Sequence, residues 1–193
     1  MRLLLTGLTA GVLVLSACST PAATLPSPTA TVAATPTATP APTPQLKFIF
    51  TADLKPSNEV PPITGPEATC AGKGTFTLTT TKDASGTITG GSALFETDVT
   101  GCPAGTEINI GHIHKEVAGK NGGVVINSGL AKGELVLTGG AGKINKTATV
   151  VDAGGLTAAA LATDIIANPA NYYMNWHSTL APGGVIRGQL VKQ

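Results

Sequence analysis

The chain has 193 residues, among them 12 lysines and arginines, 11 aspartates and glutamates, and only three histidines. Apart from Arg2, eleven basic residues balance eleven acidic ones, so the chain has no positive field that would attract phosphate groups. The composition therefore argues against nucleic acid as a partner.

Residues 1–17 have the pattern of an export signal. Arg2 supplies a positive charge, residues 3–15 form an apolar run, and small residues precede Cys18. The run is shorter than the roughly 20 apolar residues of a membrane-spanning helix. Its end, "LSAC", resembles the bacterial lipobox, in which cleavage precedes the cysteine and its thiol is acylated. The resemblance implies a lipoprotein signal peptide and a chain that is lipid-anchored through Cys18 to the membrane of the cell envelope, outside the cytoplasm. A simple secretory signal is less favoured, because it would leave a reactive thiol in an oxidising compartment.

Residues 18–45 are predicted to be a disordered, lipid-anchored linker. After the cysteine they contain 8 threonines, 7 prolines, 7 alanines and no charged residue, and this composition buries too little apolar area to offset the entropy of ordering. In an extended polyproline conformation the linker would reach at most ~80 Å from the membrane. We therefore expect it to act as a tether.

Residues 46–193 have the length of one domain with its own hydrophobic core. Their two cysteines, Cys70 and Cys102, form an even pair in a domain that is expected to be exported, where disulfides persist. We predict that they are joined. A pair of metal-binding cysteines is less favoured, because the two residues do not have the CxxC spacing.

Nine short segments are rich in β-branched or aromatic residues and are separated by glycine, proline, asparagine or aspartate, which is typical of strands and turns. Only residues 156–169 have apolar side chains near a 3.6-residue period, and they end in "NP", which predicts one short helix. The pattern favours an all-β fold, a single Greek-key or immunoglobulin-like β-sandwich or barrel. The predicted strands are residues 46–54, 72–80, 86–99, 106–114, 122–128, 133–139, 145–151, 171–178 and 183–191.

Four segments of this region resemble a known family when they are taken in order. They are "NEVPP" (58–62), "GHIHKEVAGKNGGVVI" (111–126), "YYMNWHS" (172–178) and "PGGVIRGQL" (182–190). Their order and rough spacing are similar to those of the CHRD domain, which is named for chordin and also occurs singly in bacterial exported proteins. The resemblance covers nearly all of residues 46–193. It implies an immunoglobulin-type β-barrel that is distantly similar to copper/zinc superoxide dismutases.

The chain departs from the usual pattern of that family near its C-terminal end. The common ending runs "NVHT" and then "PGGEIRGQL", whereas here Trp176 precedes His177, Ser178 follows it, and Val185 replaces a frequent acid. The missing carboxylate weakens any mechanism that would need an acid at that position.

All three histidines lie inside the four segments. His112 and His114 are two residues apart, as are Asn175 and His177. Side chains two apart on a strand share a face, so two neighbouring strands would bring three imidazoles and one amide together. We expect Glu59 and Arg187, the charged residues of the other two segments, to support this group.

Two interpretations of the group stay open. Three imidazoles with an open position suit copper or zinc and resemble the ligands of catalytic zinc. Alternatively, the histidines anchor a buried hydrogen-bond network, with Glu59 and Arg187 as an ion pair. The network is slightly favoured, because arginine would repel a dication and no aspartate lies near enough in sequence to orient the imidazoles.

Enzymatic activity has little support in the sequence. There is no GxSxG motif, and Ser178 would face away from His177 on a strand. Superoxide dismutases use more histidines than this chain has, together with an aspartate, so similarity of fold does not carry their activity. We therefore expect no catalytic residues.

The function favoured by these observations is a cell-envelope lipoprotein. It would display a CHRD domain on a flexible tether as a non-enzymatic binding module for an extracytoplasmic protein partner. The alternative is a copper- or zinc-binding domain, with a role related to redox chemistry, whose ligands are His112, His114 and His177.

Overall fold

The computed structural model describes residues 45–193. The predicted signal peptide, Cys18 and the linker up to residue 44 lie outside the described residues. The described part is mostly β, with two antiparallel sheets and one α-helix, so the predicted all-β fold is confirmed. No helix in this part combines the length and the apolar character that crossing a membrane would require.

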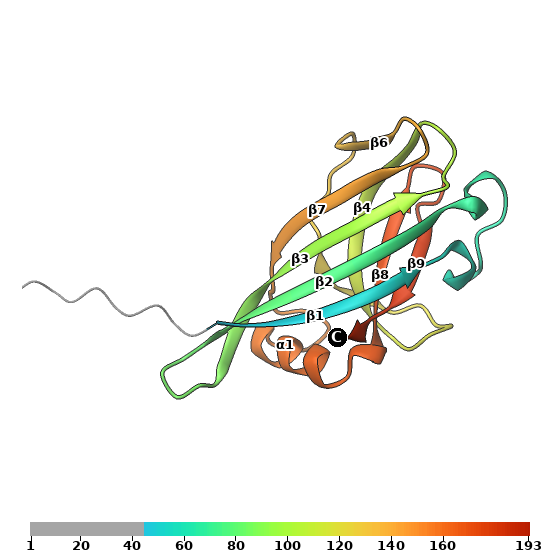
Figure 1. The fold of residues 1–193 in the computed structure, drawn as a ribbon. Helices are drawn as coiled ribbons and strands as arrows, with labels where there is room; N and C mark the ends of the chain where they lie inside the picture. Colours follow the sequence, from blue (N-terminus) through green and yellow to red (C-terminus); the bar gives the residue numbers. More distant parts are fainter. Residues whose placement is uncertain (1–44) are drawn as a thin grey trace, which may run out of the picture. The chain divides into compact units, whose positions relative to one another are not determined.

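The first sheet contains five strands in the order β10-β1-β2-β3-β7 and forms one layer of the molecule (Figure 1). Long hairpins join β1 to β2 and β2 to β3, and these strands pair along almost their whole length. The strands are β1 (Gln45–Leu54), β2 (Ala71–Lys82), β3 (Ile88–Thr100), β7 (Gly142–Thr149) and β10 (Val191–Lys192).

The second sheet has the order β5-β4-β8-β9, with the short β6 paired to β4 (Figure 1). Its strands are β4 (Thr106–Lys115), β5 (Gly123–Asn127), β6 (Leu135–Leu137), β8 (Tyr172–Ser178) and β9 (Ile186–Gln189). Each predicted strand therefore has a counterpart in the structure. The last predicted strand is divided at Leu190 into β9 and β10, because the chain there passes from the second sheet to the first.

The two sheets are joined along one side of the sandwich. The backbone N–H of Lys55, directly after β1, donates to the carbonyl of Arg187 on β9 at 3.0 Å, and the reverse bond is 3.3 Å. This bridge closes one side of the sandwich. It also brings the end of β1, and the segment that follows it, next to β9.

One helix and three 3-10 segments complete the fold. Helix α1 (Ala158–Ala167) lies inside the predicted helical range and begins after Thr157, whose side chain accepts a hydrogen bond from the Ala160 N–H. Its buried side chains pack beside β3 at one end of the sandwich (Figure 1). The 3-10 segments, η1 (Pro56–Asn58), η2 (Pro66–Thr69) and η3 (Pro169–Asn171), each begin with proline and were not predicted.

The core lies between the two sheets and contains a row of aromatic rings. Phe50, Phe76 and Phe95 of the first sheet follow one another, and Phe95 contacts Trp176 of β8 with a ring-centroid separation of 6.1 Å. The indole N–H donates to the hydroxyl of Thr97 at 3.0 Å. Because neighbouring side chains on a strand face opposite ways, the residues next to Trp176 on β8 point out of the core.

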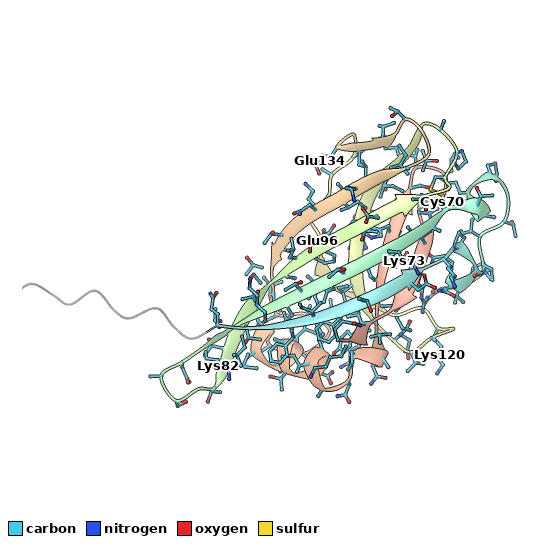
Figure 2. All side chains as sticks on the ribbon, viewed as in Figure 1. Cys70, Lys73, Lys82, Glu96, Lys120 and Glu134 are labelled. Atoms are coloured by element: carbon cyan, nitrogen blue, oxygen red, sulfur yellow. A yellow bond between two sulfur atoms is a disulfide. The ribbon has the colours of Figure 1, made fainter. Side chains whose placement is uncertain are left out.

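The predicted disulfide is present. Cys70 and Cys102 are both buried and are joined, and Figure 2 shows Cys70 just before β2. The bond links the start of β2 to the connection between β3 and β4 and closes a loop with a sequence separation of 32 residues. A loop of this length corresponds to a stabilisation of about 3–4 kcal/mol in the chain-entropy account.

We expect Gly111→Ala to destabilise the domain strongly. Gly111 lies opposite Trp176, and a Cβ atom there would be 2.0 Å from two carbons of the indole ring. Overpacking of this kind costs about 1–3 kcal/mol, occasionally more. Unfolding in urea, followed through the fluorescence of Trp176, the only tryptophan, measures the effect.

Gly123→Ala is the matched control, because a Cβ atom at Gly123 on β5 would meet no atom within 4 Å. Its free energy of unfolding should stay within about 0.5 kcal/mol of the wild-type value. Equal stability of the two variants would show that the contact between Gly111 and Trp176 is not tight.

Candidate metal centre

The three histidines lie together on the outer face of the second sheet. His112 and His114 are on β4, and His177 is on β8, where it pairs with Ile110. One nitrogen from each ring lies within 4.8 Å of the other two, and all three residues are buried. The spacing of two residues that predicted a shared face therefore holds on both strands.

The nitrogen of each ring that faces the cluster is defined by its contacts. Nδ1 of His114 lies 3.0 Å from the carbonyl oxygen of Gly122, and Nδ1 of His177 lies 2.9 Å from that of Pro182. A carbonyl only accepts, so both Nδ1 atoms carry the hydrogen and both Nε2 atoms keep a lone pair. Nε2 of His177 then accepts from Nδ1 of His112 at 3.2 Å.

These carbonyls orient the imidazoles in the way that outer partners of metal ligands commonly do. The sequence analysis looked for an aspartate in this role and found none. The partners are backbone atoms in the loops that follow β4 and β8, and a backbone carbonyl carries no signal in the amino-acid pattern. One of the two reasons for disfavouring a metal is therefore removed, and the other, the positive charge of Arg187, still acts on His114.

Burial keeps the histidines neutral. Burial, with smaller contributions from the nearby His177 and His114, lowers the pKa of His112 to about 4. Burial also lowers the pKa of His114 and that of His177, although the carbonyl partner of each ring acts in the opposite direction. At neutral pH the imidazoles therefore carry lone pairs and no charge, which is the state that binds metal ions.

A stack of three side chains supports His114. The ring of Tyr173 lies parallel to the imidazole at a centroid distance of 4.8 Å, and the Arg187 guanidinium carbon lies 3.5 Å from the Tyr173 centroid. The Tyr173 hydroxyl accepts the N–H of Gly122, whose carbonyl binds His114. The sequence analysis missed Tyr173, although its alternation with Asn175 and His177 on one strand could have found it.

Arg187 is buried and belongs to this stack rather than to an ion pair. Its guanidinium donates to the Asn121 side chain at 3.0 Å and to the carbonyl of Lys120, which lies on the loop between β4 and β5 (Figure 2). Among the ion pairs of residues 45–193, none joins Arg187 to Glu59. The direct pair that the network interpretation included is therefore wrong, because other acceptors bind the guanidinium.

Glu59 and Asn175 form a buried pair beside the histidines. Asn175 lies opposite His112 in the β4–β8 ladder, and its side-chain amide lies beside the Glu59 carboxylate. Burial raises the pKa of Glu59 to about 7, although the charge of Arg187 and the bond from Asn175 act to lower it. The carboxylate is therefore held at a position where its negative charge is costly.

Three acceptor atoms at this site have no hydrogen-bond partner. They are Nε2 of His114, Oδ1 of Asn175 and Oε1 of Glu59, and within residues 45–193 only one other buried side-chain atom, Oε1 of Glu67, is in this state. An unpaired buried polar atom costs about 1–3 kcal/mol, so a concentration of them at one place requires an explanation. A cation beside the histidines would satisfy Nε2 of His114.

A pocket of about 510 Å³ opens beside this pair and has Glu59, Arg187 and Gln189 in its wall. The histidines do not line it. A molecule in the pocket would therefore contact the supporting residues and not the imidazoles.

The model of the CHRD domain family matches residues 50–190. The chain belongs to this family. No curated protein and no solved structure matches the chain. In this CHRD domain, all four segments that carry the resemblance contribute to the site: Glu59 comes from the first, the His112–His114 pair from the second, Asn175 and His177 from the third, and Pro182 and Arg187 from the fourth.

We expect His112 to make the metal-free domain less stable in acid. An unfolded histidine binds a proton with a pKa of 6.5, whereas folding lowers the pKa of His112 to about 4. Between these pH values the unfolded state binds more protons than the folded state. The stability that neutral His112 provides is therefore fully present above pH 6.5 and is lost as the pH falls towards 4. The loss is on the order of 3 kcal/mol.

Glu59 gives stability the opposite dependence on pH. Folding raises its pKa from 4.5 to about 7, so the stability that its protonated form provides is lost as the pH rises through that range. The His112→Gln variant separates the two effects. Its stability relative to wild type should become more favourable as the pH is lowered, which urea unfolding at a series of pH values measures. A difference that stays constant with pH would contradict the neutral, buried state of His112.

Proposed function

We propose that this CHRD domain binds a copper or zinc ion through His112, His114 and His177. The observation that carries the proposal is the unpartnered Nε2 atom of His114, which is buried and lies within reach of the other two rings. Nε2 has a lone pair because Nδ1 of the same ring carries the hydrogen, and no hydrogen-bond donor reaches that lone pair. A purely nitrogen ligand set suits these two metals.

The spacing of the ligand atoms supports the same assignment. Two nitrogens that bind one tetrahedral zinc ion at about 2.0–2.1 Å are separated by about 3.3 Å. Nδ1 of His112 and Nε2 of His177 lie 3.2 Å apart. For Nδ1 of His112 to bind the ion, its hydrogen would move to Nε2 of the same ring. A hydrogen-bond network would account for this pair equally well, but it would leave His114 without a partner. The metal interpretation satisfies all three rings.

The proposed ion would have an open position. Among the described residues, the group of side chains close enough to share an ion contains the three histidines and no cysteine or carboxylate. We assign no general acid or base to this site, so the proposal is a binding function and not an enzymatic one. It deepens the interaction module that family membership supports.

We expect the wild-type chain to bind Zn(II) and Cu(II) tightly at neutral pH, with one ion per chain. His114→Ala removes one of three ligands, and the loss of affinity should exceed the roughly 10–100-fold cost of removing an outer partner. Competition titration against a chelating dye measures both affinities. The matched control is Asn145→Ala on the exposed face of β7, which should bind as wild type. Binding by His114→Ala at the wild-type level would refute the site.

We also propose that the domain is exported and lipid-anchored through Cys18. The charge at Arg2, the apolar run and the resemblance of "LSAC" to a lipobox support this proposal. The threonine- and proline-rich segment would then hold the domain away from the membrane. We also propose that the exported domain binds an extracytoplasmic protein partner. We assign no surface of the domain to that contact.

We expect Cys18→Ala to abolish anchoring, because the acylated thiol is the proposed attachment point. The variant should be found unprocessed or in the soluble fraction after cell fractionation. Ser19→Ala keeps the cysteine and should be processed and retained like wild type. Membrane retention and normal processing of the Cys18→Ala variant would remove the lipoprotein proposal.

A further inference from the structure

The Glu59 carboxylate lies beside Asn175, which is opposite His112 in the β4–β8 ladder, and among the ion pairs of residues 45–193 it has no cation as a direct partner. Only two carboxylates among residues 45–193 are more than nine-tenths buried, Glu59 at 5 % exposure and Glu67 at 4 %. We propose that Glu59, held by Asn175, supplies the countercharge that makes the three-histidine site select a divalent cation over a monovalent one. This inference rests on the proposed metal-binding function.

The contacts of Asn175 place the Glu59 carboxylate beside the cluster. Asn175 pairs with His112 across the β4–β8 ladder and lies two residues before His177 on the same face. It is 3 % exposed, its Oδ1 atom has no partner, and its amide nitrogen lies beside the Glu59 carboxylate at Gly184. The amide therefore links the carboxylate to the strands that carry the histidines.

The loop between β8 and β9 closes over this pair. At Gly184, a Cβ atom would lie 2.7 Å from both carboxylate oxygens of Glu59 and 2.6 Å from the Asn175 amide nitrogen. The φ angle of Gly184 is +130°, which other residues rarely adopt. The same loop provides the Pro182 carbonyl that binds His177, so one short segment both orients a ligand and covers the carboxylate.

The charge balance of the site gives Glu59 its role. Three neutral imidazoles bring no charge, so a divalent ion would leave two positive charges in a buried place. Arg187 adds another on the far side of the Tyr173 ring. The electrostatic energy between the ion and a nearby carboxylate is proportional to the charge of the ion. One carboxylate therefore favours a divalent ion twice as strongly as a monovalent ion.

Glu59 acts without being a ligand. The atoms close enough to share an ion belong to the three histidines alone in the described part of the chain. Glu67 has a different environment, because its carboxylate accepts a hydrogen bond from Ser178 at 2.7 Å, and Ser178 points to the opposite face of β8 from His177. These two buried carboxylates form a matched pair for an experiment.

The experiment compares Zn(II) with Ag(I) on the full chain purified in detergent and chloride-free buffer. Both ions bind imidazole but differ in preferred coordination number as well as charge, so the comparison uses only the factor by which each substitution changes the affinity for each ion. Glu59→Gln should weaken Zn(II) binding by about 10–100-fold, the range for outer partners of metal ligands. Ag(I) binding should weaken by the square root of that factor, about 3–10-fold, because the energy scales with charge.

Two further variants decide whether the charge of Glu59 or the shape of its side chain causes the preference for Zn(II) over Ag(I). The double variant Glu59→Gln/Asn175→Asp exchanges the amide and the carboxylate while it keeps one hydrogen bond between them, and it should restore the preference for Zn(II). Glu67→Gln should leave the ratio of the two affinities unchanged. Circular dichroism and Trp176 fluorescence of the metal-free variants check that each is folded.

The outcomes separate this inference from the function on which it rests. If wild type binds Zn(II) and Glu59→Gln weakens both ions by the same factor, or weakens neither, the countercharge role is overturned and the three-histidine site stands. A shift of the ratio by Glu67→Gln as large as that by Glu59→Gln would also overturn it. If wild type binds neither ion, the proposed metal function itself fails.

Discussion

The site depends on the close packing of Trp176 against Gly111. These residues face each other across β4 and β8, and the absence of a side chain at Gly111 lets the indole ring lie directly on the backbone. Side chains on a strand alternate, so a slip of one residue would exchange the two faces. By directing Trp176 into the core, this contact directs Asn175 and His177 outward, towards the histidines of β4.

The position of the site on the outer face explains its unusual electrostatics. A sheet face that carried three histidines, an asparagine and an arginine would normally be solvated. Here loops cover it, and their backbone carbonyls take the hydrogens of two imidazoles. The same cover depresses the pKa of each histidine and raises that of Glu59 to about 7, because burial opposes charge of either sign. The loops thus prepare neutral ligands close to one constrained carboxylate.

Most of the fold and part of the site were predictable from the sequence. The strand segments and the helix follow from local periodicity, and the convergence of His112, His114 and His177 follows from the same period of two. The carbonyl partners of the histidines and the alternative partners of Arg187 were not predictable. They depend on how two loops fold back over the sheet, and loop conformation has no periodic signal. The direct Glu59–Arg187 pair failed for that reason, since charge type alone does not identify a partner.

In the metal-free domain, folding leaves possible interactions of this site unmade. The lone pair of His114 and the free oxygens of Asn175 and Glu59 are buried without donors, and each such atom costs about 1–3 kcal/mol. The surrounding packing, which includes the aromatic core and the disulfide, has to offset that cost in the metal-free state. An ion that binds His114 in the folded state alone recovers the part of this cost that falls on its lone pair and stabilises the domain in proportion to the logarithm of its concentration. Preorganised, unsatisfied acceptors therefore connect the stability of this domain to the occupancy of its site.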